Sequence, residues 1–242
     1  MKWIWFCAVF CLMANPVGGQ EKASAVSSAE SAKAVDPMKL RAHYVQALNM
    51  VKFGMDEEAI SELKKCLEID PNFAEAHFEL GKSYCRTGRL DEGVSEFKKV
   101  LEIKPQYEGV HYELGLVYYD KDMVEEGLSL CKEYLKDRPQ DGKMHSLAGV
   151  LFIKKKAVPE AISEFKEQIE LGHHPELGYV NLGMALAMKE SWDEAITAYK
   201  KALELNDRNP RAHYQLAVAY EKKGLKEEAQ KEQAIYRELT GK

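Results

Sequence analysis

A spacing of 34 residues recurs along this sequence and constrains its fold more than any other feature. Short strings that begin with histidine or tyrosine start 34 residues apart, at His43, His77, His111, His145, Tyr179 and His213. Small residues form a second column sixteen positions later, at Ala59, Gly93, Gly127, Ala161, Ala195 and Ala229. A fixed period of this length is typical of repeat arrays, in which each unit packs on its neighbours. The period divides the chain into six units, at 40–73, 74–107, 108–141, 142–175, 176–209 and 210–242.

Each unit contains two helical patterns. In the second unit, apolar residues spaced three and four apart predict helices over 74–86 and 91–103, with a turn at Gly88 between them. The small residue Gly93 stands where the two helices must approach each other closely. One helix pair cannot bury its apolar faces by itself, so we expect the six pairs to stack on one another.

The details of the repeat resemble the tetratricopeptide repeat family. The resemblance rests on the period, the Leu80-Gly81-x-x-Tyr84 string and its copy from Leu114, the column of small residues, and the prolines that close the first three units, Pro71, Pro105 and Pro139. It covers residues 40–242 in six copies. The resemblance implies an all-α, right-handed superhelical solenoid of six helix pairs, which binds protein or peptide partners and needs no cofactor.

Two parts of the array depart from the regular pattern. The fourth unit has Lys156 where a turn glycine is usual, Pro159 at the start of its second helix, and Gly172-His173-His174-Pro175 at its end, so we expect irregular junctions there. The second helix of the sixth unit carries polar residues where earlier units are apolar, at Gln230, Gln233 and Arg237. We therefore expect this helix to face solvent as a cap.

The resemblance also implies a concave groove lined by the first helices. Two columns of side chains should face it: Tyr44, Phe78, Tyr112, Ser146, Val180 and Tyr214 in the first, and Leu48, Lys82, Leu116, Val150, Met184 and Val218 in the second. Family members that bind chaperone tails clamp a terminal carboxylate with Lys and Asn here; only Lys82 fits, so we do not expect that mode. An exposed apolar stripe in a groove is typical of a partner-binding site. The alternative is that these residues pack on neighbouring first helices and expose little.

The histidines that begin most units suggest a metal site, but their spacing argues against one. Equivalent positions lie on different helices, whose axes are about 8–10 Å apart, whereas zinc needs each ligand nitrogen at about 2.0–2.1 Å. The adjacent pair His173-His174 has no third ligand within sequence reach, and metal binding there is a minor alternative. We expect the other histidines to fill core positions in the first helices: His43, His77, His111, His145 and His213.

Three cysteines lie in the array, at Cys66, Cys85 and Cys131, and an odd number cannot all pair within one chain. We expect free thiols, because Cys66 and Cys131 share columns with apolar core residues and buried free cysteine behaves as a small apolar side chain. A Cys66–Cys85 disulfide between adjacent units is the alternative in an oxidising compartment.

The charged residues indicate no catalytic chemistry. Carboxylates fall in mixed pairs such as Glu62-Lys65 and Glu96-Lys99, which we expect on solvated helix faces, and we expect the same of the run Lys154-Lys155-Lys156. The sequence contains no phosphate-binding glycine loop, nucleophile elbow or zinc-protease motif. The net charge of −5 gives no basic footprint for nucleic acid. We therefore expect neither an enzyme with a small-molecule substrate nor a nucleic-acid-binding protein.

The first 39 residues differ from the array. Lys2, an apolar run over 4–14 and the small residues Val17-Gly18-Gly19 follow the order of a secretory signal peptide, which we predict at 1–19. Residues 20–39 are rich in Ala and Ser, which predicts a linker. No apolar run reaches the ~20 residues that span a bilayer, so stable membrane insertion is not expected. These features predict an exported protein, periplasmic or secreted.

These features favour a non-enzymatic, exported interaction scaffold that binds an apolar or amphipathic segment of another protein in its groove. The alternative is a structural envelope-assembly factor that self-associates edge to edge, with the groove empty. Light scattering separates the two hypotheses, because a monomer at every concentration disfavours self-association.

Overall fold

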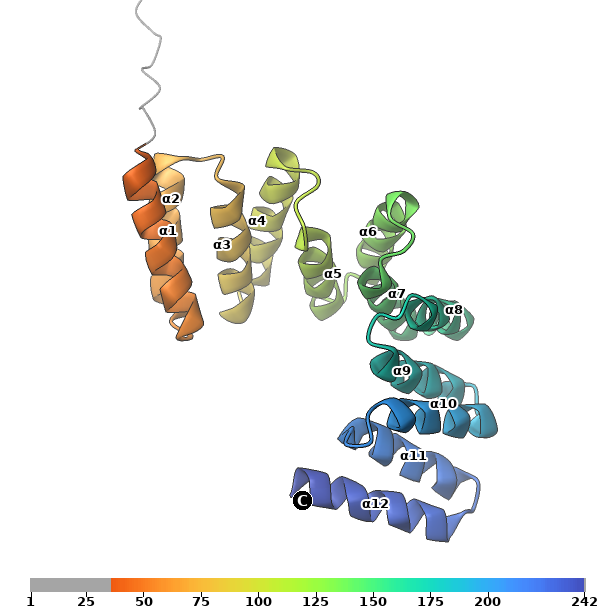
Figure 1. The fold of residues 1–242 in the computed structure, drawn as a ribbon. Helices are drawn as coiled ribbons and strands as arrows, with labels where there is room; N and C mark the ends of the chain where they lie inside the picture. Colours follow the sequence, from red (N-terminus) through yellow and green to blue (C-terminus); the bar gives the residue numbers. More distant parts are fainter. Residues whose placement is uncertain (1–35, 242) are drawn as a thin grey trace, which may run out of the picture. The chain divides into compact units, whose positions relative to one another are not determined.

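The structure, a computed structural model, describes residues 36–241, so the predicted signal peptide and most of the predicted linker lie outside the described residues. Within this range the chain forms twelve α-helices and no strand, which confirms the expected all-α class (Figure 1). None of these helices is both long enough and apolar enough to cross a bilayer. Their bounds are α1 (Pro37–Lys52), α2 (Asp56–Ile69), α3 (Ala74–Arg86), α4 (Leu90–Ile103), α5 (Val110–Asp120), α6 (Val124–Asp137), α7 (Gly142–Lys154), α8 (Val158–Glu170), α9 (Pro175–Met188), α10 (Trp192–Leu205), α11 (Pro210–Lys222) and α12 (Lys226–Thr240).

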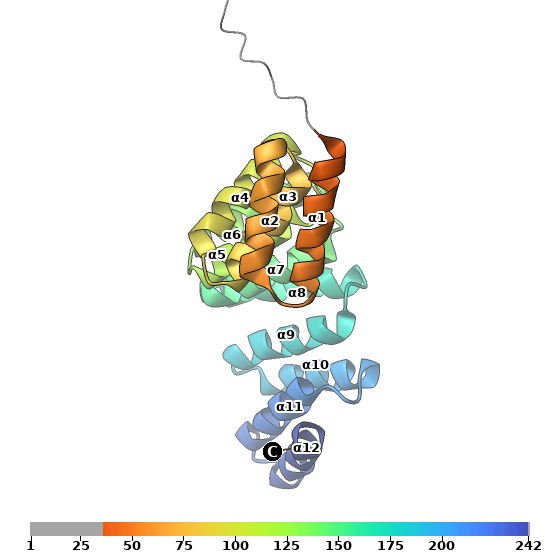
Figure 2. The ribbon, with the colours of Figure 1, turned by 90° about the vertical axis from the view of Figure 1, so that its left-hand side faces the viewer.

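The helices pair in chain order, and the pairs stack on one another. Each odd-numbered helix packs against the helix that follows it, and each even-numbered helix packs against the first helix of the next pair. Each first helix also contacts the first helix of the next pair, whereas among the twelve described helices no contact joins two second helices. Figure 2 shows α1 and α2 side by side at the start of this stack. The first helices therefore line one surface together.

Six equivalent turns join the helices of each pair. One residue at the same point in every turn has a left-handed backbone conformation. This conformation costs a residue with a Cβ atom roughly 1–2 kcal/mol, whereas glycine adopts it without that cost. In the first, second and sixth pairs it is glycine, at Gly54, Gly88 and Gly224. In the third, fourth and fifth pairs it is Asp122, Lys156 and Glu190, with φ of 61°, 63° and 59°. These three turns therefore keep the left-handed conformation without glycine.

Helix boundaries in the second pair agree with the prediction. The predicted helix at 74–86 is α3, and α4 begins at Leu90. The first helix starts earlier than predicted, at Pro37, because the Asp36 side chain accepts hydrogen bonds of 3.1 and 3.2 Å from two backbone N–H groups of the first turn. The helical array therefore begins before residue 40, and the last part of the predicted linker belongs to it.

The junction between the fourth and fifth pairs is irregular, as expected. Pro159 lies in the first turn of α8, where the N–H that proline lacks would have no helical partner. Between α8 and α9, Gly172 and His174 both have left-handed backbone conformations, with φ of 68° and 45°. The next helix then begins at Pro175.

Apolar side chains form a series of clusters along the array, as expected when each unit packs on its neighbours. Phe97, Phe165 and Tyr199 occupy one position of three second helices and are all buried. At Gly93 the two helices approach so closely that a Cβ atom would lie 2.5 Å from Cys85 Sγ. The predicted close approach at this column is therefore confirmed.

Both ends of the array expose polar residues, and α1 also exposes Met38 and Val45, at 79% and 47%. Leu80 and Ser83 of α3 are buried, whereas the residues at the same positions of α1, Gln46 and Asn49, are exposed. At the other end, Ala229 is the buried residue of α12, and its polar positions include the exposed Gln230 and Arg237. The predicted cap at α12 is therefore confirmed, and α1 exposes polar residues at the other end.

Candidate functional site

The surface lined by the first helices carries most of the predicted groove columns. Leu48 and Tyr214 are 37% and 45% exposed. Val180 is 1% exposed and lies in the core instead, because it packs against the small residues Ala202 and Ala212. The remaining members are half-buried: Tyr44, Phe78, Lys82, Tyr112, Leu116, Ser146, Val150, Met184 and Val218. Both earlier alternatives thus hold in part, since these side chains pack on the core and also keep some exposed surface.

A small pocket opens on this surface where α5, α7, α9 and α11 come together. Its volume is about 170 Å³. Apolar side chains and two cations line it, among them Val150, Ile153, Phe165, Met184, Lys154 and Arg211. Lys154 pairs with Asp122 at 3.0 Å, whereas among the described residues Arg211 pairs with no carboxylate, and its Nη2 lies 2.9 Å from the Met184 sulfur.

The charge of the first helices changes sign along the array. α3 and α5 together carry two cations and four carboxylates, the latter at Glu75, Glu79, Glu113 and Asp120. α7, α9 and α11 together carry two carboxylates and four cations, the latter at Lys143, Lys154, Arg211 and Lys222. α1 carries three cations, Lys39, Arg41 and Lys52, and no carboxylate. The carboxylates of α3 act on it across the interface, since burial and the Glu79 carboxylate raise the pKa of Tyr44 to about 12.

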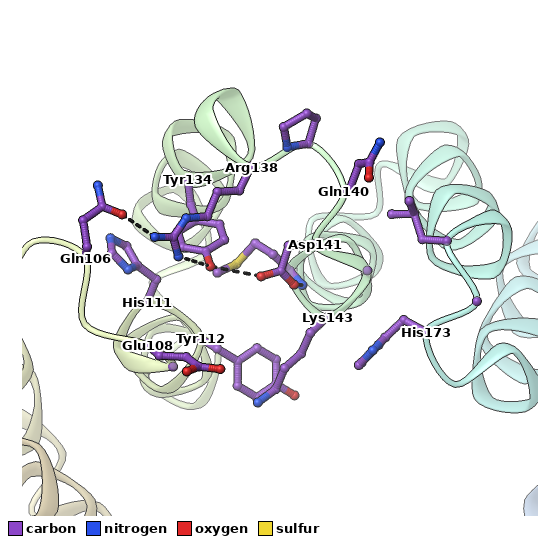
Figure 3. Close-up of a pocket in the computed structure, with 16 residues that line it drawn as sticks. Gln106, Glu108, His111, Tyr112, Tyr134, Arg138, Gln140, Asp141, Lys143 and His173 are labelled. Carbon is purple, nitrogen blue, oxygen red and sulfur yellow. Dashed lines mark hydrogen bonds between the residues drawn. The ribbon is translucent and has the colours of Figure 1, made fainter.

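A larger cleft of about 890 Å³ lies at the ends of α5, α6 and α7 (Figure 3). Its polar groups are bonded to one another: Arg138 donates to the Tyr134 hydroxyl at 2.9 Å, and that hydroxyl donates to Asp141 Oδ2 at 3.0 Å. The His111 ring packs against Tyr134 with 4.8 Å between centroids, and burial lowers its pKa. Lys143 Nζ lies 3.9 Å from the centroid of a neighbouring tyrosine ring. Arg138, Tyr134 and Asp141 are thus already bonded to one another within the chain.

The histidine column faces the second helices, and it does more than fill the core. In four helix pairs Nδ1 lies 2.5–2.7 Å from a glutamate oxygen nineteen residues later, in His43–Glu62, His77–Glu96, His145–Glu164 and His213–Glu232. His111 and Tyr179 have Leu130 and Ala198 at the matching position and form no such pair. His77 and His213 are buried, as predicted for core residues, but the prediction missed the glutamate partners of four histidines. Glutamates at this fixed offset were visible in the sequence and are the signal that reveals the pairs.

The geometry of the His77–Glu96 pair indicates ionised partners. His77 Nε2 also lies 2.9 Å from the Pro71 carbonyl oxygen, which only accepts hydrogen bonds, so this nitrogen carries a proton. Burial alone would lower the pKa of His77, but the hydrogen bonds to Glu96 and to this carbonyl raise it. Burial opposes ionisation of Glu96, yet the hydrogen bonds from His77 and Lys99 lower its pKa. An imidazolium–carboxylate pair thus joins the two helices.

Two expectations about charged residues are corrected. Glu62 and Glu96 are 7% and 9% exposed, so they are not solvated surface groups, because the histidines draw them toward the core. Lys154 and Lys155 are not simply solvated either, since Lys155 pairs with Glu125 at 2.8 Å and Lys154 with a carboxylate of the same preceding helix pair. These lysines tie the fourth helix pair to the third.

The three cysteines are free thiols in this structure. Burial raises the pKa of Cys66 and of Cys85 to about 11, and that of Cys131 to about 12. Such thiols stay protonated near neutral pH and are poor nucleophiles. Among residues 36–241, no three His, Cys, Asp or Glu side chains gather in a way that would hold a metal ion.

Comparisons with known proteins agree with this architecture. A family profile described as TPR repeat matches residues 54–88, 81–122 and 183–224. No curated protein matches the sequence significantly. Among solved structures, the chain is similar to MamA from residue 41 onward, from Desulfovibrio magneticus RS-1, with 20% identity and a TM-score of 0.65 over 72% of this chain and 98% of that one.

Two further structures are similar over most of their own length. PilF from Pseudomonas aeruginosa has 19% identity and a TM-score of 0.69, over 84% of this chain and 92% of that one. YrrB is described as a TPR protein with an unusual peptide-binding site. It has 20% identity and a TM-score of 0.55, over 73% of this chain and 91% of that one. Likenesses at these identities show the fold, which is an all-α superhelical repeat. Proteins of this kind typically mediate protein–protein interactions. The profile match identifies tetratricopeptide repeats at residues 54–122 and 183–224, and the solved structures share the fold.

Proposed function

We propose that this chain is a non-enzymatic, exported interaction scaffold that binds an apolar or amphipathic segment of another protein along its first helices. The observation that carries the proposal is the row of apolar side chains that stay partly exposed on that surface, from Leu48 to Val218. Contiguous exposed apolar surface is typical of a partner site. A peptide-binding site is also described for the structurally similar YrrB. Export is supported by the signal-peptide pattern at 1–19.

The chemistry of the described residues favours binding over catalysis. The buried histidines are engaged with glutamates and backbone carbonyls, so they hold helices together and do not face a substrate. The thiols have raised pKa values. In the cleft of about 890 Å³, Arg138, Tyr134 and Asp141 are bonded to one another. Nothing among these groups resembles a nucleophile beside a free base.

Self-association by end-to-end stacking finds less support. Such stacking would bury the exposed polar residues of α1 and α12, including Gln46, Asn49 and Gln230. A buried polar group without a partner costs about 1–3 kcal/mol, so each would oppose the contact. These polar residues therefore favour a groove partner over an extended array of copies.

Photo-crosslinking of the full chain in its host tests the proposal. Benzoyl-phenylalanine replaces Leu48 or Tyr214 on the groove surface, and in a control it replaces Lys98, which is exposed on the second helix α4. We expect adducts with another protein from the two groove positions and none from the control. Adducts between two copies of this chain would support self-association instead. Adducts from Lys98 alone would refute the groove proposal.

A further inference from the structure

The pocket beside Val150 and Met184 has apolar walls and room for one side chain. Its volume is about 170 Å³. An apolar cavity of about 150 Å³ in another protein binds benzene, so this pocket has the size for a phenyl ring. Val150, Ile153 and Met184 are half-buried here, and Phe165, which is itself buried, also lines the pocket. Such a lining favours an aromatic or large aliphatic group.

Positive charge borders the same pocket. Lys154 and Arg211 line it, and Arg211 is exposed and pairs with no carboxylate of the described chain. Glu176, the one carboxylate of α9, lies 3.2 Å from His174 at the start of that helix. Lys154 is already paired with Asp122 at 3.0 Å, so the charge that is available to a ligand at the rim is that of Arg211.

Two neighbouring first helices, α3 and α5, have the opposite character, whereas α1 carries only cations. α3 and α5 carry four carboxylates, and of these Glu79 and Glu75 pair with Lys82 and Lys104 at 3.1 and 2.7 Å. The chain as a whole has a net charge of −5, so attraction of an acidic ligand must be local. Local attraction is physically reasonable, because at physiological salt charges beyond about 8 Å are largely screened.

We propose that α7, α9 and α11 bind an acidic protein segment that carries one phenyl-sized apolar side chain. The ring occupies the pocket beside Val150 and Met184, and a flanking carboxylate faces Arg211. This inference rests on the proposed groove-binding function and names the chemistry of the partner. Apolar burial supplies most of the affinity, and Arg211 selects acidic segments and orients them.

A fluorescence anisotropy experiment on the full chain tests this inference. The probe is a fluorescein-labelled peptide of sequence Gly-Asp-Glu-Phe-Glu-Asp-Gly with blocked ends. Three matched peptides replace its Phe by Ala, its acids by their amides, or its acids by Lys. We expect the acidic Phe peptide to bind most tightly, and we expect raising NaCl from 50 to 500 mM to weaken it.

Charge reversal at Arg211 sharpens the test. Arg211→Glu should weaken binding of the acidic Phe peptide about fivefold or more while leaving the melting temperature unchanged, because the side chain is exposed. The matched control is Arg41→Glu, since Arg41 is exposed at the same repeat position of α1 and far along the array from the pocket. This control should leave the affinity unchanged.

The possible results separate the inference from the function on which it rests. Equal binding of the amide or Lys peptide, or no effect of Arg211→Glu, would overturn the acidic preference and leave groove binding intact. Equal binding of the Ala peptide would overturn the role of the pocket. If none of the four peptides binds, the inference fails, and the photo-crosslinking experiment, which requires no chosen peptide, still decides the proposed function.

Discussion

The two faces of the first helices follow different rules. On the face turned to the second helices, the same histidine–glutamate pair recurs in four of the six helix pairs, with 2.5–2.7 Å between its atoms. On the groove face, one column changes from Lys82 through Leu116 and Val150 to Met184 over four helix pairs. A residue type that recurs at one repeat position maintains the shape of the repeat, whereas residues that vary set what each stretch can contact. Substitutions on the two faces should therefore change different properties, stability on one and binding on the other.

Removing a carboxylate from the recurring face should have the largest effect. Glu96→Ala leaves His77 buried without its ionic partner, and losing one member of a buried pair costs about 3–5 kcal/mol. Urea unfolding of the full chain measures the loss. The control is Glu102→Ala, because Glu102 is exposed on the same helix and should matter little. Equal losses from the two variants would contradict the structural role of the pair.

Replacing the histidines by Phe should separate the paired from the unpaired ones. His111 has no glutamate partner, so His111→Phe should cost less than ~1.5 kcal/mol, as volume-conserving changes do. His111→Ala should cost about 2–4 kcal/mol, because it leaves a cavity. His77→Phe should cost more than His111→Phe, since Glu96 stays buried and unpaired. Thermal melts of the three variants check this order, and equal costs for the two Phe variants would remove the distinction between the helix pairs.

The recurring pairs also predict how stability depends on pH. The pKa of His77 is raised above its usual 6.5, so its contribution to stability is complete below 6.5 and is lost as the pH rises through the raised value. The pKa of Glu96 is lowered below its usual 4.5, so its contribution is complete above 4.5 and is lost as the pH falls through the lowered value. The contribution of the His77–Glu96 pair to the melting temperature should therefore be greatest between pH 4.5 and 6.5. Replacing both His77 and Glu96 by Leu should weaken the decline on each side, and an unchanged profile would contradict the assignment.

The fold could be predicted from the sequence much more fully than the contacts. The 34-residue period locates α3 and α4 because one helix pair repeats locally, without distant pairings to guess. The histidine–glutamate pairs were missed because the partners lie on two helices, so helical periodicity within one segment does not relate them. Burial of Val180 was missed because it depends on the small size of Ala202 and Ala212, which belong to other helices. Because Lys156 replaces the usual turn glycine, we expected an irregular turn there. The backbone instead keeps the same left-handed conformation as in the other turns.

Substitutions in the turns should give the smallest change in stability. At this position the left-handed backbone conformation recurs in every helix pair, but the residue type varies. Lys156→Gly should raise stability by about 0.5–1 kcal/mol, because glycine relieves the left-handed conformation at φ 63° but has more freedom to lose on folding. No neighbouring atom lies within 4 Å of a Cβ built at Gly88. The reverse change Gly88→Lys should therefore lower stability by a similar amount through backbone conformation alone. If the two substitutions shift the urea midpoint in the same direction, backbone conformation is not the reason.

The central claim is that a ligand contacts the groove face of α7 to α11 and leaves the recurring face undisturbed. A methyl NMR titration of the full chain with the unlabelled acidic Phe peptide measures this directly. We predict that the methyl signals of Val150, Ile153 and Met184 move with increasing peptide, while those of the buried Ile60 and Val100 stay in place. Saturating peptide that leaves Val150, Ile153 and Met184 unmoved, or that moves only Leu48 on α1, would contradict the account.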